Sequence, residues 1–295
     1  MEQPSPRSTA QPTHNKYIGM DAEPERKPVS TRPVANPRPS DFLRLHWFDV
    51  GIILSAIVCV YTLTTRLSEI ALLLWLNLAA LFVHQFEEYR FPGYFPGMIN
   101  STFFSSKQPD RYPLNTNSAA AVNLGTGWLA YFLAALFNTQ AIWLGIAVTI
   151  ITLGNVVIHA AVFNIRGRTF YNPGMASGVV LFLPISAYFY HLIIISNAAS
   201  LPDWILGVIL GGVLFYTGID KLVDWLKDEN TPFMFPQRCL APSSRQSTNQ
   251  NTIPAPLSNS ARQPLVGAAV HHSAASYRRR QRAGLPLATR PCPAV

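Results

Sequence analysis

Long apolar runs alternate with short polar breaks through the middle of the chain. Six of these runs are close to the roughly 20 residues that a helix needs to cross the hydrocarbon core of a bilayer. Helices are expected because lipid offers no hydrogen-bonding partner to exposed backbone groups. The pattern predicts an all-α fold, a polytopic membrane helix bundle with about six transmembrane helices. The predicted helices cover residues 46–64, 69–88, 118–138, 141–163, 175–196 and 203–226.

The breaks between these runs carry residues that favour turns. Asn-Thr-Gln at 138–140 separates the third run from the fourth, and Asn-Pro-Gly at 172–174 precedes the fifth. Ser-Leu-Pro-Asp at 200–203 precedes the sixth. We therefore expect the later helices to be joined by tight connections.

Both ends of the chain differ from this apolar middle part. The chain as a whole is 49% hydrophobic and only 13% charged, whereas a soluble domain has about 25% charged residues. The ends are polar and rich in Pro, Ser, Arg, Gln and Asn, a composition that buries too little apolar surface to fold alone. We predict a membrane domain at 46–226 between a disordered tail at 1–45 and a largely disordered tail at 227–295.

The distribution of Lys and Arg predicts an orientation, because basic residues favour cytoplasmic loops. With the N-terminus inside, the outer loops contain Arg66 alone, and both tails are basic within a net charge of +8. We predict an integral membrane protein with both termini cytoplasmic and with the lipid bilayer as its main partner. The tails are candidates for contact with anionic lipids, and no nucleic-acid binding is expected. The predicted inner loops contain Arg90, Lys107, Arg111, Arg166 and Arg168.

Ionisable residues gather near the predicted inner ends of two helices. His84, Glu87 and Glu88 have i, i+3, i+4 spacing and share a helix face. Asn155 and His159 form a second polar pair, at the same predicted depth on the fourth helix. Two imidazoles and a carboxylate can hold a divalent transition metal, and similar spacings build metal sites in helix bundles. We predict a Zn, Fe or Mn site with His84, Glu88 and His159 as ligands.

A simpler interpretation is a polar helix end that meets the lipid headgroups, with Arg90 pairing to a glutamate. Two arguments oppose it. A helix C-terminus carries partial negative charge, so glutamates there cost about 0.3–1 kcal/mol each. Ionisable residues within membrane spans are also costly and usually face a functional interior.

The segment RTFYNPGM at 168–175 is a second candidate region. Its Asn-Pro-Gly sequence predicts a tight turn that directs Tyr171 toward the membrane interface near the inner ends of the second and fourth helices. An ordinary helix-entry turn with an aromatic interfacial anchor remains the alternative.

These features together resemble the HXXEE family, integral membrane proteins of unknown function. The resemblance covers roughly residues 45–225 and implies that the matching positions matter for a function that has been suspected to be enzymatic. It supplies no established substrate. The matching residues are His84, Glu87, Glu88, the lone His159, Tyr171, Pro173 and Gly174.

The side chains favour a metal-dependent membrane enzyme, and a hydrolase first among such enzymes. Glu87 is the candidate general base, although the two glutamates are interchangeable at this stage. Asn155 is a candidate for orienting His159 or the substrate, and Tyr171 for donating a hydrogen bond to a developing oxyanion. A site at the cytoplasmic boundary suits a membrane-embedded substrate such as a lipid or an isoprenoid, or a membrane-presented peptide.

Two alternatives belong to other classes of protein. A proton- or cation-coupled transporter would use the histidines and glutamates as a relay, but the outer halves of the helices offer a thin polar path of Asn77, Asn138 and scattered Ser and Thr. A non-catalytic structural membrane protein would act through its basic tails. A CAAX-type protease is disfavoured because Pro92 stands where its Glu-Glu-x-x-x-Arg motif needs arginine.

Overall fold

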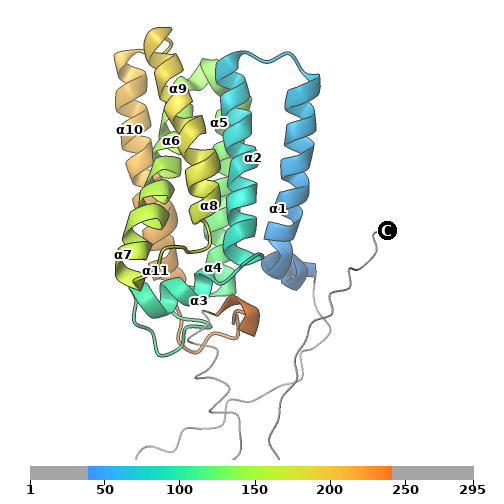
Figure 1. Cartoon of the computed structure of the whole chain (residues 1–295), viewed down its shortest axis with the longest axis vertical. Coiled ribbons are helices and arrows are strands. Elements are labelled where there is room, and N and C mark those ends of the chain that lie inside the picture. The colour runs from blue at the N-terminus through green and yellow to red at the C-terminus, as the bar shows by residue number, and fades with distance from the viewer. Residues whose placement is uncertain (1–38, 241–295) are drawn as a thin grey trace, which may run out of the picture. The chain divides into compact units, whose positions relative to one another are not determined.

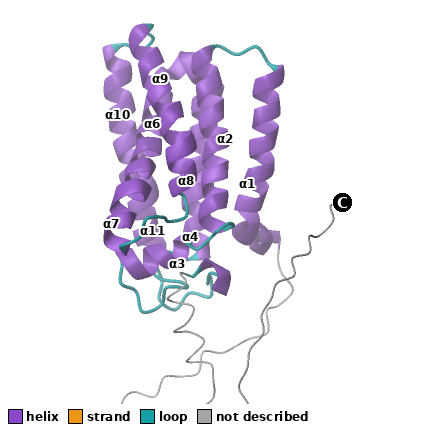
Figure 2. Ribbon diagram, viewed as in Figure 1, coloured by secondary structure: helices purple, strands orange, loops and turns teal. Residues whose placement is uncertain are grey.

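Residues 39–240 are described in the computed structural model, and they form a bundle of helices (Figure 1). Within this range the chain consists of helices, turns and loops, without strands (Figure 2). Five helical stretches are long and apolar enough to cross a membrane, which confirms the predicted all-α membrane fold. The stretches are Asp41–Thr64, Glu69–Tyr89, Thr116–Gly167, Met175–Ile195 and Leu201–Leu226.

The helices are labelled in chain order, with η for π-helical and 3₁₀ segments. The first part of the bundle contains α1 (Pro39–Thr64), α2 (Glu69–Tyr89), α3 (Phe95–Met98), η1 (Ile99–Phe103), α4 (Thr116–Ala120), η2 (Ala121–Trp128), α5 (Leu129–Phe137) and η3 (Asn138–Ala141). The second part contains α6 (Ile142–Val157), η4 (Ile158–Val162), α7 (Phe163–Gly167), α8 (Met175–Ser177), η5 (Gly178–Phe182), α9 (Leu183–Ile195), α10 (Leu201–Phe215), η6 (Tyr216–Lys221), α11 (Leu222–Leu226) and η7 (Gln237–Cys239).

The third stretch is 52 residues long and folds back on itself. The chain turns at Asn138, whose φ of 33° is positive, and this is where the Asn-Thr-Gln sequence predicts a break. Across the resulting hairpin the hydroxyl of Tyr131 on α5 lies 2.8 Å from the hydroxyl of Thr152 on α6. Because each half is long enough for one crossing, the described bundle has six crossing arms.

One end of the bundle gathers the start of α1, the start of α4 and the end of α11, and we call it the site end. The Arg44 guanidinium donates to the Thr116 hydroxyl over 2.5 Å. The Asn115 amide donates to the Leu226 carbonyl over 3.0 Å. Both ends of the described chain lie here, as an even number of crossings requires (Figure 1).

The chain stays packed beyond residue 226, where we placed the end of the domain. Phe235 and Cys239 are buried, and Arg238 donates to the Tyr89 carbonyl at the end of α2 over 2.7 Å. The apolar side chains of this segment explain why it continues the domain to residue 240. Residues 39–45, which we predict to belong to the disordered N-terminal tail, form the start of α1. The rest of the two predicted tails, 1–38 and 241–295, lies outside the described residues.

The last four crossing arms share a further feature, a π-helical turn in the half nearest the site end. Such wide turns are rare and are frequently found at functional sites. They leave the apolar outer halves regular and change the direction of side chains where the polar residues gather. The four turns are η2, η4, η5 and η6.

Small residues and polar contacts hold the arms together. On α10, a Cβ added at Gly207 would lie 2.6 Å from Ile146 Cβ on α6, so these helices approach closely. Such small-residue contacts are typical of packing between membrane helices. Between α2 and α6, the Asn77 amide donates to the Thr152 hydroxyl over 3.1 Å, and Thr152 also contacts α5.

Candidate metal centre

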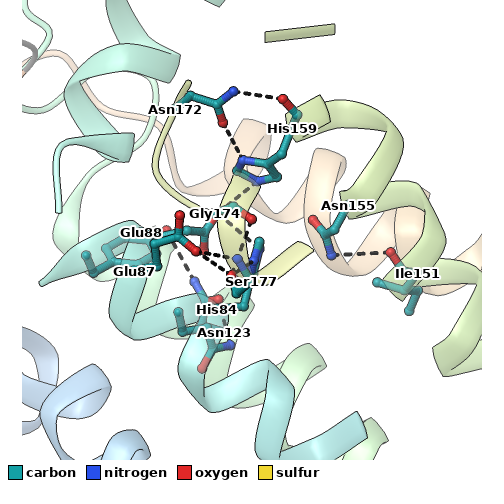
Figure 3. Close-up of polar contacts among 12 residues, drawn as sticks. His84, Glu87, Glu88, Asn123, Ile151, Asn155, His159, Asn172, Gly174 and Ser177 are labelled. Carbon is teal, nitrogen blue, oxygen red and sulfur yellow. Dashed lines mark hydrogen bonds and ion pairs between the residues drawn. The ribbon is translucent and has the colours of Figure 1, made fainter. Parts of the chain in front are cut away.

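His84, Glu88 and His159 lie together in the buried interior at the site end (Figure 3). His84 and Glu88 come from the last turns of α2, and His159 from the π-helical turn η4. The two imidazole ring centres are 4.9 Å apart. The Glu88 Oε1 atom is 3.6 Å from His84 Nε2 and 3.2 Å from His159 Nε2. The arms that carry the three predicted ligands are therefore in contact, which the sequence left open.

Hydrogen bonds on the far side of the His84 ring indicate which nitrogen carries its proton. The Ser177 hydroxyl donates its single proton to Glu87 Oε2 over 2.5 Å. Toward His84 Nδ1, 3.0 Å away, the same hydroxyl must then accept. The Nδ1 atom of His84 therefore carries hydrogen, and the Nε2 atom of the neutral ring presents a lone pair to Glu88.

The ring of His159 is held in the same tautomer by Asn172. The Asn172 amide nitrogen donates to the His159 carbonyl and to Asn164 Oδ1, both over 2.8 Å. This leaves Asn172 Oδ1 to accept from His159 Nδ1 over 2.7 Å. When this ring is neutral, the Nε2 atom of His159 also presents a lone pair to Glu88.

Two imidazole lone pairs and a carboxylate oxygen converge, an arrangement that a cation stabilises. The three ligand atoms lie within 4.8 Å of one another. Ligand atoms around a tetrahedral ion at about 2.0–2.2 Å are about 3.3 Å apart, close to the two histidine–glutamate distances. Histidines that bind a metal usually donate the N–H of the other ring nitrogen to a hydrogen-bond acceptor, as the Nδ1–H groups of both rings do here. The group can hold a metal ion.

Glu87 faces different partners from its neighbour Glu88. Its carboxylate accepts from the Tyr171 hydroxyl over 2.9 Å and from the Ala176 amide over 3.1 Å. The Ser177 amide donates over 2.8 Å, beside the hydroxyl described above. Negative charge is favourable at a helix N-terminus, so Glu87 anchors the start of the fifth arm.

The Asn-Pro-Gly turn passes directly beside both imidazole rings. Gly174 has a φ of 100°, and a Cβ there would lie 2.5 Å from His159 Cε1 and 2.8 Å from His84 Cε1. Only glycine fits this position without strain. The sequence identified the turn but missed the histidine-holding function of Asn172 within it and of Ser177 just after it.

Tyr171 lies in the loop before α8 and donates to Glu87. Burial, and next the hydrogen bond to Glu87, raise the pKa of the Tyr171 hydroxyl above its usual 10. The group therefore stays a protonated donor at neutral pH. Asn155 does not hold the His159 ring, since its amide donates to the Ile151 carbonyl over 3.3 Å and the partner of His159 Nδ1 is Asn172.

A cavity of about 130 Å³ adjoins the candidate ligands. His84 and Glu88 form part of its wall, together with Asn155 and Asn123. Glu87 does not line it, so the two glutamates differ in their access to a small molecule.

The remaining candidates lie outside the group. Arg90 pairs with Asp49 over 3.2 Å rather than with a glutamate of α2. Asp224 pairs with Lys221 and Lys227 at the end of the sixth arm, as ion pairs at a membrane boundary would. The alternative of a headgroup-exposed helix end does not match the burial of Glu87 and Glu88.

Six crossing arms around a buried His-Glu-His group define a polytopic helical membrane protein that can hold a metal ion in its interior. Residues 75–189 match the family model described as "Protein of unknown function with HXXEE motif". The match confirms the resemblance inferred from the motifs and covers both histidines, both glutamates and the Asn-Pro-Gly turn. Comparison with curated proteins and with solved structures gave no match.

Proposed function

We propose that the protein is a metal-dependent membrane enzyme of hydrolase type. The observation that carries the proposal is the convergence of two imidazole Nε2 lone pairs on the Glu88 carboxylate. In a buried setting this convergence favours a bound cation, because charged or electron-rich groups without a partner are costly there. A bound transition metal would supply an activated water or polarise a substrate oxygen.

The chain's own residues divide the remaining work. Ser177 and Asn172 orient the two rings through their Nδ1–H groups. Glu88 is the carboxylate that faces both the histidines and the cavity, which favours it as the ligand. The sequence predicts Glu87 as the general base, but its carboxylate oxygens accept four hydrogen bonds. These hydrogen bonds favour it as a positioning residue that holds the turn against the rings.

The cavity beside the group supports a substrate-binding function. Asn155 lines this cavity, and hydrogen bonding to a substrate fits its position better than orienting His159. Tyr171 contacts Glu87 rather than the cavity, so we assign it to support of that carboxylate. A relay would need polar groups along the whole of α2, but beyond the buried Asn77 the helix packs Ile70, Leu73 and Leu74 into an apolar core.

Elemental analysis of the full chain, purified in detergent without chelators, tests the proposal. We expect close to one zinc, iron or manganese ion per chain, and at least a tenfold loss in the His84→Ala, His159→Ala double variant. His191→Ala is the matched control, because this exposed histidine lies outside the group and should leave the metal content unchanged.

An Asn172→Ala variant covers the case in which the double variant fails to fold. Its ligands remain, but loss of the bond to His159 should weaken metal affinity by about 10–100-fold. A folded wild-type protein that takes up none of the three metals when each is offered would overturn the proposal.

A further inference from the structure

The cavity beside the candidate metal group is too small for a whole substrate molecule. Its volume of about 130 Å³ compares with roughly 300–1,000 Å³ for sites that enclose a small organic ligand. It can hold a reacting group and a few further atoms. The rest of any larger substrate must extend beyond its walls.

A second hollow begins on the other side of one wall. This groove has a volume of about 580 Å³ and runs between η1, η4 and the η6–α11 segment. Four apolar residues line both spaces, so they form the boundary between the groove and the cavity. These shared residues are Ile99, Leu114, Ile219 and Val223.

The lining of the groove indicates what it can bind. Aromatic and aliphatic side chains dominate it, including Phe103, Phe163 and Phe215. Its charged residues all come from η6 and α11 and from the lysine that follows, where Asp224 is paired with two lysines. An extended peptide would leave its backbone polar groups unsatisfied against such walls, whereas a hydrocarbon chain would not.

The sixth arm exposes apolar side chains beside this region. Tyr216, in the π-helical turn η6, is more than half exposed, and Trp225 on α11 is 68% exposed. Apolar exposure of this kind is expected where helices face lipid. A chain could therefore reach the groove from the bilayer without crossing water.

We propose that the substrate carries a long hydrocarbon chain, fatty acyl or isoprenyl, which lies in the groove while its polar reacting group enters the cavity. This inference rests on the proposed function for the chemistry at the metal group. The occupancy of the groove by a chain is nonetheless measurable without any turnover.

The test uses an alkyne-tagged fatty acid with a diazirine in its chain, added to the full protein in phosphatidylcholine nanodiscs and activated by light. We expect crosslinks to concentrate on residues 99–104 and 215–223, and to be displaced by untagged fatty acid. Val223→Trp fills the shared wall and should reduce this labelling at least tenfold. Ile209→Trp is the control, because Ile209 is 59% exposed on α10 and does not line the groove.

The outcomes separate this inference from the proposed function. Labelling spread evenly over all exposed arms, or equal labelling of the two Trp variants, overturns the proposal that a hydrocarbon chain lies in the groove. Metal content is measured on the same wild-type sample. If the groove is labelled but the protein contains no metal, the proposed function alone is overturned. If Val223→Trp does not fold, displacement from the two segments in the wild type decides the question, and lack of displacement counts against the inference.

Discussion

Glu87 and Glu88 are consecutive residues whose carboxylates face different partners. Glu88 points to the two imidazoles, and Glu87 points to the start of the fifth arm. The i, i+3 and i+4 spacing correctly placed both on the face of His84, but one helix cannot reveal what the neighbouring arm presents to each. The backbone amides of Ala176 and Ser177 donate to Glu87 and so distinguish it from Glu88. The position of a backbone amide cannot be read from residue types.

Gly174 allows the tightest approach in the site. We expect Gly174→Ala to cost about 1–3 kcal/mol from its positive φ alone, with a further cost from contact between the new methyl group and the rings. Thermal unfolding in detergent and metal content measure both effects. Gly125→Ala is the control, because a Cβ there has no atom within 4 Å. A Gly174→Ala protein with wild-type melting and metal content would contradict the account of the turn.

The functions of Asn172 and Ser177 could not be predicted from the sequence. The metal-ligand residue types and their depth in the membrane were visible in the sequence, since imidazoles and carboxylates are rare in apolar runs. Their hydrogen-bonding partners are Asn and Ser, which also occur in ordinary turns and helix starts. Without the fold, nothing distinguishes these two from Asn164 on α7 or Thr169 in the loop that follows it.

At the scale of elements, hydrophobic runs predicted the crossing arms closely. The second run was expected at 69–88 and α2 spans Glu69–Tyr89. The expected break near residue 138 is a turn with positive φ. The π-helical turns were not predicted, because they differ from α-helix in hydrogen-bond register and not in composition.

The close packing of α10 on α6 yields a prediction with a neighbouring control. Gly207→Ala places a methyl group 2.6 Å from Ile146 Cβ, and we expect overpacking to destabilise the fold by about 1–3 kcal/mol. Gly212→Ala on the same helix meets open space and should be neutral or stabilising by up to about 1 kcal/mol. Unfolding of both variants in the same detergent gives the comparison. Equal shifts for the two would show that the arms are not closely packed there.

For the whole molecule, the basic residues define an expected orientation. Among the described residues, Arg66 alone lies near the opposite end, and the other arginines and lysines lie toward the site end. By the preference of basic residues for the cytoplasmic side, the site end should face the cytoplasm.

Cysteine labelling in a cysteine-free background tests this orientation. We expect Thr139→Cys, in the exposed turn between α5 and α6, to react with an impermeant maleimide added outside intact cells. Lys107→Cys, exposed in the loop after η1, should react only after permeabilisation. The reverse pattern would place the metal group at the outer surface and contradict the predicted topology.

The sequence did not predict the lateral order of the arms, that is, which arms are neighbours in the bundle. Equal depth for His84 and His159 followed from counting residues along two helices. Their contact depends on which arms are neighbours, and this is decided by pairings such as Gly207 with Ile146 and Asn77 with Thr152. These pairings join residues far apart in the chain.

The π-helical turns of the last four arms divide the bundle into two zones. Each such turn holds one extra residue, and one residue corresponds to a rotation of about 100° around a helix. The row of side chains that faces the bundle interior is therefore rotated around the helix axis where an arm passes through its π-helical turn. We call this rotation a change of phase. The cavity beside the candidate ligands lies at this change of phase, because residues of two of these turns, Asn123 and Thr126 of η2 and Ile219 of η6, form part of its wall.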